Sequence, residues 1–278
     1  MRIAVLASGS SGNALLLTSN TTAVLVDAGI SARRIEAGLA ATGLDGSALD
    51  AVLVTHEHGD HVTGLGPIAR RCRLPVYATP GTHSMIGRFL GGCEAFEVEP
   101  GESFGLGDLS IWPFSVSHDC ADPVGYAVTD GVSTVAVATD LGHVGRGVRH
   151  HLASADCVVL ESNHDERMLL DGPYPWHLKQ RILSNVGHLS NSDASSELEA
   201  IAHGPLATVI LAHVSKENNT LELARETAAA ALARAGRPDV DVLAAGPAGV
   251  PGPIDVGRRS RATGERAGRQ EVPAPCRR

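Results

Sequence analysis

The residues best suited to chemistry lie together near position 60. Between Thr55 and His61 the sequence is Thr-His-Glu-His-Gly-Asp-His, which contains four metal-binding side chains: His56, His58, Asp60 and His61. Four ligands this close do not suit a single catalytic ion, because catalytic Zn²⁺ keeps a coordination position open for water. The spacing therefore indicates two neighbouring metal ions. The alternative is a chance grouping in a chain with 13 histidines, and the elements on either side argue against it.

A strand and a helix are expected to hold this cluster. Residues 50–55 form a continuous apolar run, typical of a strand that is buried on both faces. Gly59 permits a sharp turn, and residues 61–72 have apolar positions spaced as one face of a helix. Asp60 lies at the predicted helix start, where the helix dipole favours an anion. The ligands should thus leave the carboxyl end of a strand.

The composition is that of one enzyme domain with an aliphatic core. Of the 278 residues 43% are hydrophobic, but only 3% are aromatic. No apolar run reaches the roughly 18 residues of a membrane span, and the apolar start is too short for a secretory signal. We therefore expect a cytoplasmic protein with no membrane partner. The five cysteines form no CxxC pair, and we expect ordinary thiols at Cys72, Cys93, Cys120 and Cys157.

Charge is distributed unevenly along the chain. The net charge is −8, and residues 256–278 carry seven Arg and two Glu, so that residues 1–255 carry −13. A body this acidic does not by itself favour nucleic-acid binding. The segment from residue 246 is rich in Gly, Pro and Arg and lacks apolar periodicity. We expect a hydrolase domain over residues 1–245 and a disordered tail over residues 246–278, which either holds a polyanion or is simply solvated.

Short apolar strands occur in two series with helices between them. The expected strands cover residues 3–6, 14–18, 23–27, 50–55 and 75–78, then 109–116, 124–128, 132–139, 158–161 and 207–212. The expected helices cover residues 31–41, 61–72, 175–186, 192–201 and 220–235. Two similar series with outer helices predict an α/β fold of two face-packed mixed sheets, a four-layer αββα sandwich.

Polar residues follow four of these strands, namely Asp27, His118, Asp140 and His213. A lone Asp at a strand end is more often a turn or cap residue. Because the same chain contains the cluster at 56–61, we interpret these polar residues as parts of one metal site. Loops at strand ends can bring such distant side chains together. These four residues are the remaining candidates for the metal site.

In this order the candidate residues resemble the metallo-β-lactamase superfamily, over about residues 1–240. The resemblance implies two divalent ions, Zn²⁺ or Mn²⁺, with Fe²⁺ also suited to nitrogen and oxygen ligands. It implies that Asp140 bridges the ions and that Asp27 orients a ligand by hydrogen bonding. The ligands that it implies are His56, His58 and His118 for the first ion, and Asp60, His61 and His213 for the second.

Local strings narrow this resemblance to one subgroup. They cover residues 9–13, 117–119, 139–143, 161–165, 187–191 and 212–219. Together they are similar to the YycJ/WalJ (VicX) subgroup of bacterial metallo-β-lactamase-fold proteins. That subgroup is associated with 5′-to-3′ DNA exonuclease activity and with mismatch repair. The implied function is a two-metal phosphodiesterase on DNA, in which metal-bound hydroxide attacks phosphorus and Asp60 is a catalytic metal ligand.

Other functions stay open at this stage. The acidic body favours a small-molecule thioester or lactone hydrolase, as in glyoxalase II, although this chain shows one convincing helix after His213 where that enzyme has a helical domain. A metal-stabilised regulatory or binding protein is a third possibility. The complete ligand set argues against it, because a structural site needs no open coordination position. Exported β-lactamases fit less well because they often have Cys in place of Asp140.

Residues outside the ligand set have candidate roles of their own. His188, in Gly-His-Leu-Ser-Asn, is similar to a His that protonates the leaving oxygen in tRNA-processing relatives, or else it caps the helix near Ser192. Trp176 either stacks on a base or packs at a helix start. His164 is a substrate contact, a ligand or a structural residue. Further candidate substrate contacts are Ser10 and Asn13, in a loop that is either a phosphate nest or a hairpin turn, and Lys216, Asn218 and Asn219.

Overall fold

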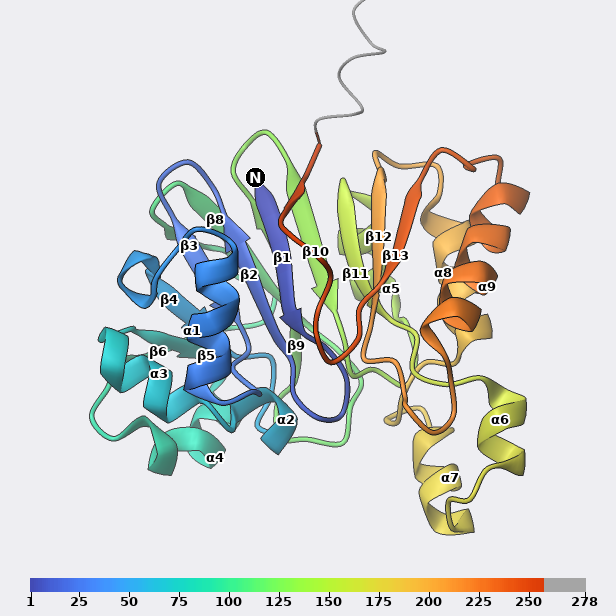
Figure 1. The fold of residues 1–278 in the computed structure, drawn as a ribbon, viewed down its shortest axis with the longest axis horizontal. Coiled ribbons are helices and arrows are strands. Elements are labelled where there is room, and N and C mark those ends of the chain that lie inside the picture. The colour runs from blue at the N-terminus through green and yellow to red at the C-terminus, as the bar shows by residue number, and fades with distance from the viewer. Residues whose placement is uncertain (258–278) are drawn as a thin grey trace, which may run out of the picture.

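Two seven-stranded mixed sheets pack face to face in the computed structural model, which describes residues 1–257 (Figure 1). The first sheet has the order β14-β1-β2-β3-β4-β5-β6, and the second has the order β13-β12-β11-β10-β9-β8-β7. The strands of the first sheet are β1 (Arg2–Ala7), β2 (Ala14–Thr18), β3 (Ala23–Val26), β4 (Ala51–Leu53), β5 (Val76–Ala78), β6 (Ala95–Glu97) and β14 (Ile254–Asp255). Those of the second are β7 (Phe104–Leu106), β8 (Leu109–Ser115), β9 (Val124–Thr129), β10 (Thr134–Ala138), β11 (Cys157–Glu161), β12 (Thr208–Ala212) and β13 (Asp241–Ala244).

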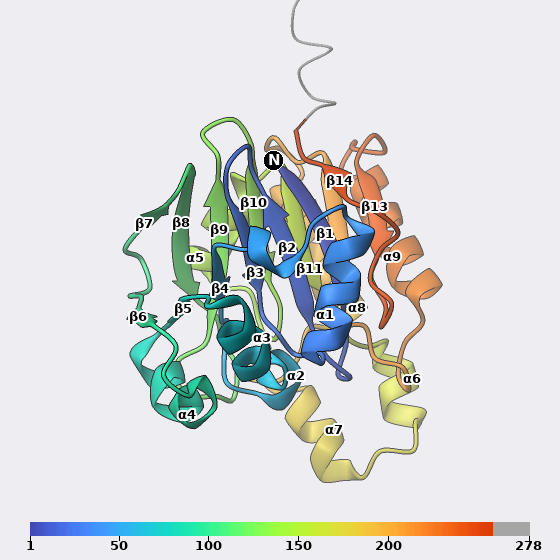
Figure 2. The ribbon, with the colours of Figure 1, turned by 60° about the vertical axis from the view of Figure 1, so that its left-hand side comes forward.

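Helices cover the outer face of each sheet. On the first sheet lie α1 (Ala32–Ala41), α3 (Leu65–Cys72) and α4 (Pro80–Leu90), with the short α2 (Gly59–Val62) at its edge. On the second lie α5 (Arg146–Ala153), α8 (Asn191–Ile201) and α9 (Leu221–Arg234). Figures 1 and 2 show α6 (Glu166–Asp171) and α7 (Trp176–Ile182) projecting from the body. The predicted four-layer αββα sandwich is confirmed.

The apolar runs are continuous because each strand is buried on both faces. In β3, Val24 and Val26 belong to the core between the sheets, whereas Leu25 belongs to the core beneath the helices. Side chains alternate between the two faces of a strand, so both faces need apolar residues in a sandwich. Leu25 is 0% exposed, and Leu25→Ala should cost about 2–5 kcal/mol of stability.

The prediction of a single helix over residues 61–72 is wrong in one respect. The structure has two helices there, α2 and α3. Gly64 lies at the break, where a Cβ atom would come within 1.9 Å of the Ile30 carbonyl oxygen. The Gly64 N–H donates to the Ala28 carbonyl at 2.7 Å. The break thus lets the backbone after the ligand cluster lie directly against the segment that follows β3.

The predicted disorder does not extend to residues 246–257. Ile254 pairs with Ile3 across β14 and β1, and the Val250 N–H donates to the Val5 carbonyl at 3.1 Å. Val256 is 4% exposed. This segment therefore completes the edge of the first sheet. The rest of the predicted tail, residues 258–278, lies outside the described residues.

The sequence analysis does not predict several elements, including α4, whose N-cap Thr79, Pro80 and Gly91 are helix signals. They are α4, α5, α6, β6, β7, β13 and β14. The helix predicted over residues 175–186 is shorter than expected and ends at Ile182. The chain turns back after it, and the His188 N–H donates to the Ile182 carbonyl at 3.0 Å. Among the described helices, none combines the length and the apolar character that crossing a membrane requires.

Candidate metal centre

Three of the predicted site residues, two ligands and the orienting Asp27, lie just after strands and adopt an unusual backbone conformation. Asp27 follows β3 with φ of 60°, Asp140 follows β10 with φ of 57°, and His213 follows β12 with φ of 52°. Left-handed conformations are uncommon for residues other than glycine and concentrate at functional sites. Surrounding contacts hold them, for example the His213 N–H to Ser8 Oγ at 2.8 Å. The three strands thus deliver their side chains to the same edge of the sandwich.

Three imidazoles converge in a first group. His58 Nδ1 lies 3.1 Å from His56 Nε2 and 3.2 Å from His118 Nε2. His118 donates from Nδ1 to the Gly187 carbonyl at 3.1 Å, so its Nε2 presents a lone pair to the group. Converging lone pairs repel one another unless a cation lies between them. Three neutral imidazole nitrogens around one point are a suitable donor set for Zn²⁺ or a similar ion.

A carboxylate and two imidazoles form the second group. Asp60 Oδ2 lies 3.3 Å from His213 Nε2 and 3.7 Å from His61 Nε2. His61 Nδ1 lies 2.7 Å from Asp27 Oδ2, and Asp27 also accepts hydrogen bonds from the Thr55 N–H and hydroxyl, each at 2.8 Å. Asp27 therefore holds the ring of His61, the orienting contact that the resemblance implies.

Asp140 lies between the two groups. Its Oδ2 is 3.2 Å from His61 Nε2, and its Oδ1 is 3.9 Å from His118 Nε2. The residue is 2% exposed, and Oδ2 accepts no hydrogen bond from the described residues. Leaving a buried carboxylate oxygen unpaired is costly, and a bound cation would remove that cost. The structure therefore brings all seven predicted ligand residues together, in groups that could hold a metal ion.

Glu161 joins the site although the sequence analysis assigned it no role. It ends β11, is 0% exposed, and accepts through Oε1 from His188 Nδ1 at 2.8 Å and His213 Nδ1 at 2.9 Å. Its Oε2 accepts the backbone N–H groups of Leu141 and Leu189 at 3.1 and 3.0 Å. A polar residue at the end of a predicted strand was the signal that identified Asp27 and Asp140. The same signal could have identified Glu161.

Comparison with known proteins agrees with this geometry. A family model of the β-lactamase superfamily domain matches residues 22–214. The chain belongs to the metallo-β-lactamase superfamily. It is 38% identical over 239 residues to the exodeoxyribonuclease YycJ of Bacillus anthracis, covering 85% of this chain and 90% of that protein. The resemblance to the YycJ/WalJ subgroup is thereby confirmed.

Solved structures support the same fold. The metallo-β-lactamase fold protein YhfI of Bacillus subtilis has a TM-score of 0.71 at 17% identity, covering 91% of this chain and 99% of that one. Zn²⁺-bound PqqB of Methylobacterium extorquens has a TM-score of 0.69 at 16% identity, covering 92% and 100%. The superfamily match together with the exodeoxyribonuclease relatives identifies the protein as a metal-dependent hydrolase, as predicted.

Protonation of the metal-free site reflects its crowded carboxylates. Burial lowers the pKa of His213, but Asp140, Asp60 and Glu161 raise it to about 10. Burial likewise opposes the charged form of His61, yet Asp140 and Asp27 hold its pKa well above the usual range. Burial lowers the pKa of His56 well below its usual range, and the neighbouring His61 lowers it further. His61 and His213 are therefore protonated in the metal-free protein at neutral pH, and a metal ion bound there would displace these protons.

His188 does not cap the neighbouring helix. The Ser190 side chain caps α8 by accepting from the Asp193 N–H. His188 uses Nδ1 for Glu161, so that Nε2 is the nitrogen left for a substrate. The imidazole lines a cavity of about 160 Å³, which we call the inner pocket, together with Ser10, Arg181 and other residues. His188 is thus placed beside the metal centre and open to a bound molecule.

The predicted substrate contacts divide into exposed and buried residues. Ser10 and Lys216 are exposed and line a second cavity of about 250 Å³, the outer pocket. Asn13 is buried, and its side chain accepts from the Gly9 N–H at 2.8 Å and reaches His61 Nε2 at 3.0 Å. These contacts give Asn13 a part in holding the ligand loop. The 9–13 segment is therefore a structural turn in which Ser10 and Ser11 face outward.

The remaining three predicted contacts are buried inside the second half of the fold. Asn219 donates to the Ser162 carbonyl and to Asn191 Oδ1, and its own Oδ1 accepts from Asn191. Asn218 is 1% exposed, and so is His164, whose ring nitrogens lie outside the described hydrogen bonds. The burial of these side chains contradicts a direct substrate contact and supports structural roles.

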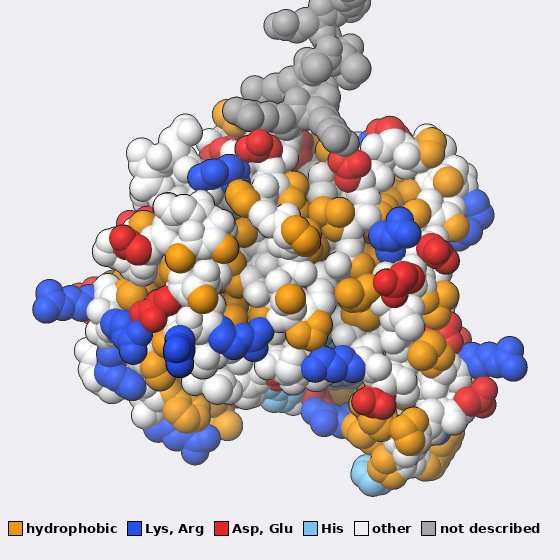
Figure 3. Space-filling view, in the orientation of Figure 1, with side chains coloured by type: hydrophobic (Ala, Val, Ile, Leu, Met, Phe, Trp, Pro, Cys, Tyr) orange, Lys and Arg blue, Asp and Glu red, His pale blue; other side chains and the backbone are white. Residues whose placement is uncertain are grey.

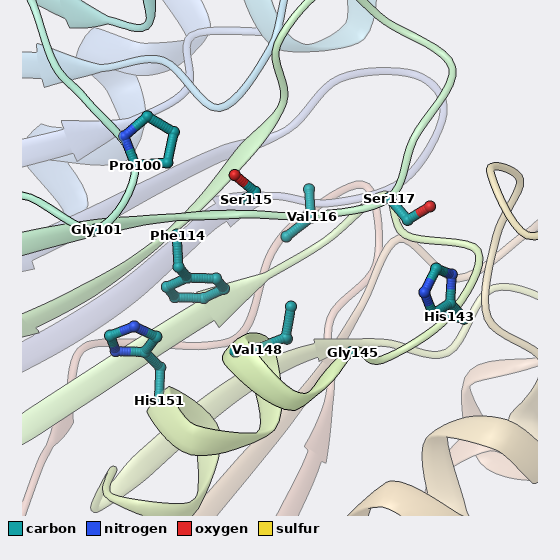
Figure 4. Close-up of a pocket in the computed structure, with 11 residues that line it drawn as sticks. Pro100, Gly101, Phe114, Ser115, Val116, Ser117, His143, Gly145, Val148 and His151 are labelled. Carbon is teal, nitrogen blue, oxygen red and sulfur yellow. The ribbon is translucent and has the colours of Figure 1, made fainter.

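Another cavity, of about 580 Å³, is lined by residues 114–117 and by residues of α5 (Figure 4). His151 stacks on Phe114 with ring centroids 4.7 Å apart, and His143 lies at the other end near Ser117. His143 Nδ1 donates a hydrogen bond to the Asn185 carbonyl at 3.1 Å. None of the candidate ligands lines this cavity, so we do not assign the reaction to it.

Proposed function

We propose that this protein is a two-metal phosphodiesterase that removes nucleotides from DNA in the 5′-to-3′ direction, and that it acts in DNA repair in the cytoplasm. The observation that carries the proposal is the Glu161–His188 pair, which lies directly beside the seven converging ligand residues. A hydrolase of thioesters has a good leaving group and little need of a proton donor. The alkoxide oxygen of a phosphodiester is a poor leaving group, so a phosphodiesterase benefits from a proton donor. The name of the B. anthracis relative, an exodeoxyribonuclease, supports the same choice.

The ligand residues divide into two sets around Asp140. His56, His58 and His118 would hold one divalent ion. Asp60, His61 and His213 would hold the other. Ions bound there supply a nucleophile from water and neutralise charge on the phosphate. Zn²⁺ and Mn²⁺ are the candidates, since every ligand atom is nitrogen or oxygen.

The protein's own residues position the other reacting groups. Glu161 accepts from His188 Nδ1, which fixes the ring and its tautomer. Burial lowers the pKa of His188, but Glu161 outweighs this and keeps the pKa above its usual range. When it is protonated, His188 would donate the Nε2 proton to the departing 3′ oxygen. Asp27 and Asn13 hold the His61 side of the site in place.

The first test is cleavage of end-labelled single- and double-stranded DNA by the protein loaded with Mn²⁺ or Zn²⁺. Stepwise shortening from the 5′ end, absent in Asp60→Ala, is the expected result. A thioester assay runs alongside. Thioester turnover without DNA cleavage would overturn the proposal in favour of a small-molecule hydrolase, and shortening from the 3′ end would overturn its direction.

The second test addresses the proton donor. His188→Ala should lower kcat on DNA by about 10²–10⁴-fold. It should lower kcat much less on a p-nitrophenyl phosphodiester, whose leaving group departs without a proton. Glu161→Gln should follow the same pattern with a smaller loss. Equal losses on both substrates would show that these residues act on something other than the leaving group.

A further inference from the structure

The outer side of α1, α3 and α4 carries a concentration of positive charge that has no part in the metal centre. We call this surface the basic face. Its six arginines are all exposed, whereas the three helices and the residue that caps α3 contain one acidic residue, Glu36. Figure 3 shows Lys and Arg side chains gathered over these helices. The arginines of the basic face are Arg33, Arg34, Arg70, Arg71, Arg73 and Arg88.

Acidic residues are missing from the stretch of sequence that builds α3 and α4. Residues 61–93 contain four arginines and no Asp or Glu, although 31 acidic residues among 278 would place about four in a stretch of that length. Residues 1–255 as a whole carry a charge of −13. The basic face is therefore an exception on an acidic body, and an approaching polyanion would meet the least repulsion there.

Helix stability does not account for this composition. Acidic side chains favour the first turn of a helix because the helix dipole is positive there, yet α1, α3 and α4 have none in that turn. In the second half of the chain α6, α8 and α9 each have one. Arginine in a last turn is a stabilising arrangement, which explains Arg70 and Arg88 but not the missing acids. Their absence points to a ligand that is itself negatively charged.

Most arginines of the basic face also lack an acidic partner. Among the ion pairs of the described residues, Arg71 pairs with Glu36 at 2.6 Å, and no other arginine of this face takes part in one. Over the second sheet, by contrast, two arginines pair with glutamates of α8 at 2.7 and 2.6 Å. The guanidinium groups of Arg33, Arg73 and Arg88 are therefore available to a phosphate.

The basic face begins at the metal centre. The Thr79 hydroxyl, at the N-cap of α4, donates to the Asp122 carbonyl at 2.7 Å, in the loop between β8 and β9 that also carries His118. From there the 11 residues of α4 extend about 16 Å. The helix ends beside α3, where Arg70 Nη1 donates to the Phe89 carbonyl at 2.7 Å. This path is as long as about five stacked base pairs.

We propose that the basic face binds the phosphate backbone of duplex DNA whose end lies in the metal centre. This inference rests on the proposed nuclease function and names the surface that holds the rest of the substrate. The arginines are spread over three helices, which suits the repeated charges of a backbone better than a small anion. A duplex is stiff over this distance, so it can reach the metal centre and the basic face at once. Phosphate contacts do not read the bases, so binding here is independent of sequence.

Exposed arginines allow a matched set of variants. Arg73→Gln/Arg88→Gln removes two charges of the basic face and leaves every residue of the metal centre in place. Arg225→Gln/Arg234→Gln is the control, because it removes the same charge from exposed positions of α9, over the second sheet. Arg33→Gln/Arg88→Gln is a second test variant. It leaves α3 and its left-handed Arg73 cap intact, so a disturbed α3 in the first variant would not decide the outcome.

Binding gives a readout that does not depend on turnover. Anisotropy of a labelled duplex is measured on the metal-free full-length proteins over a range of salt concentrations. Each test variant should reduce the slope of log K against log salt by about 1.8, the value for two lost phosphate contacts on B-DNA. The control should keep the wild-type slope. The loss of affinity should be the same for duplexes of different sequence.

Turnover separates this surface from the metal centre. On a blunt duplex with Mn²⁺-loaded protein, each test variant should raise KM by about 10- to 100-fold. The value of kcat at saturating DNA should stay within about threefold of wild type, because a backbone contact far from the reacting phosphate is equally strong in the ground state and the transition state. The control should resemble wild type in both constants.

Three results would overturn the inference. They are an unchanged salt slope and KM in both test variants, an equal loss in the control, which would make net charge alone responsible, and a fall in kcat with KM unchanged. Each of them leaves the proposed nuclease function standing. Wild type that cleaves no DNA would instead refute that function, and the DNA surface with it.

Discussion

At the scale of single residues, the site depends on side chains held in costly states. Asp27, Asp140 and His213 keep left-handed backbone conformations, and each such residue costs on the order of 1–3 kcal/mol unless its surroundings compensate. Asp140 adds an unpaired buried oxygen. The residues that carry these costs lie around the point where cations would bind. A metal ion would therefore stabilise the fold as well as supply chemistry.

Metal binding to this site should release protons. The pKa of His213 is raised to about 10, and that of His61 is also raised, so both imidazoles are charged in the metal-free protein at pH 7. Only neutral imidazoles bind a metal ion, and roughly two protons per chain should leave when Zn²⁺ is added at pH 7. The apparent affinity for Zn²⁺ should rise with pH up to about 10, the pKa of His213.

Titration of the metal-free protein with Zn²⁺ in weak buffer and a pH indicator measures this release. His213→Ala should release about one proton fewer. His203→Ala is a control because His203 is an exposed residue outside the candidate ligand groups. Zn²⁺ binding without a change in pH would contradict the protonation that the structure indicates.

At the scale of elements, α6, α7 and the segment between them (residues 166–182) form an arm with exposed hydrophobic side chains. Leu170 and Trp176 are 49% and 61% exposed, so the alternative that Trp176 packs at the helix start is wrong. Figure 3 shows hydrophobic side chains gathered over this part of the surface. One polar contact joins its two helices. Lys179, 8% exposed, donates from Nζ to the carbonyls of Leu170 and Gly172 at 2.6 and 2.8 Å.

Lys179→Met should loosen the arm while the sandwich stays folded. It keeps the aliphatic stem and leaves two carbonyls without their donor, a cost of about 1–3 kcal/mol. Amide hydrogen exchange over residues 166–186 should speed up by about 5- to 100-fold, with little change over β10 and β11. Lys216→Met, which removes an exposed lysine, is the control. Faster exchange throughout both sheets would mean that Lys179 supports the whole fold.

At the scale of the whole molecule, the chain closes its first sheet with its own late segment. Residues 246–257 add β14 beside β1, and the Pro247 carbonyl accepts from Arg34 Nη2 at 2.8 Å. The Gly246 carbonyl accepts from the Ser8 N–H at 3.0 Å. Ser8 in turn holds the backbone of His213. The segment therefore supports both a sheet edge and the metal site.

Deletion of residues 246–278 should be more harmful than deletion of residues 258–278. The longer deletion exposes the edge of β1 and removes the buried Val256 side chain, which alone contributes about 1.5–3 kcal/mol. Urea unfolding should show a difference of at least that size between the two proteins. The longer deletion should also weaken Zn²⁺ binding through Ser8 and His213. Equal midpoints for the two proteins would refute this role of β14.

The sequence by itself determined the layered fold and the residues that converge at the candidate metal site. Apolar runs in two series predicted both sheets, because a strand between two layers must be apolar on both faces. The cluster from His56 to His61 and the polar residues that follow β8, β10 and β12 predicted all seven converging residues. These features are local, so a short stretch of sequence carries each of them.

Only the tertiary structure decided which distant residues meet. Glu161 joins His188 and His213 across 27 and 52 positions. Arg181 meets Asp119 across 62 positions. β14 pairs with β1 from the other end of the described chain. Such pairings follow from strand order and register, which no local periodicity encodes. Burial then gave Asn218, Asn219 and His164 structural roles, because sequence position cannot show whether a polar side chain faces a substrate or the protein interior.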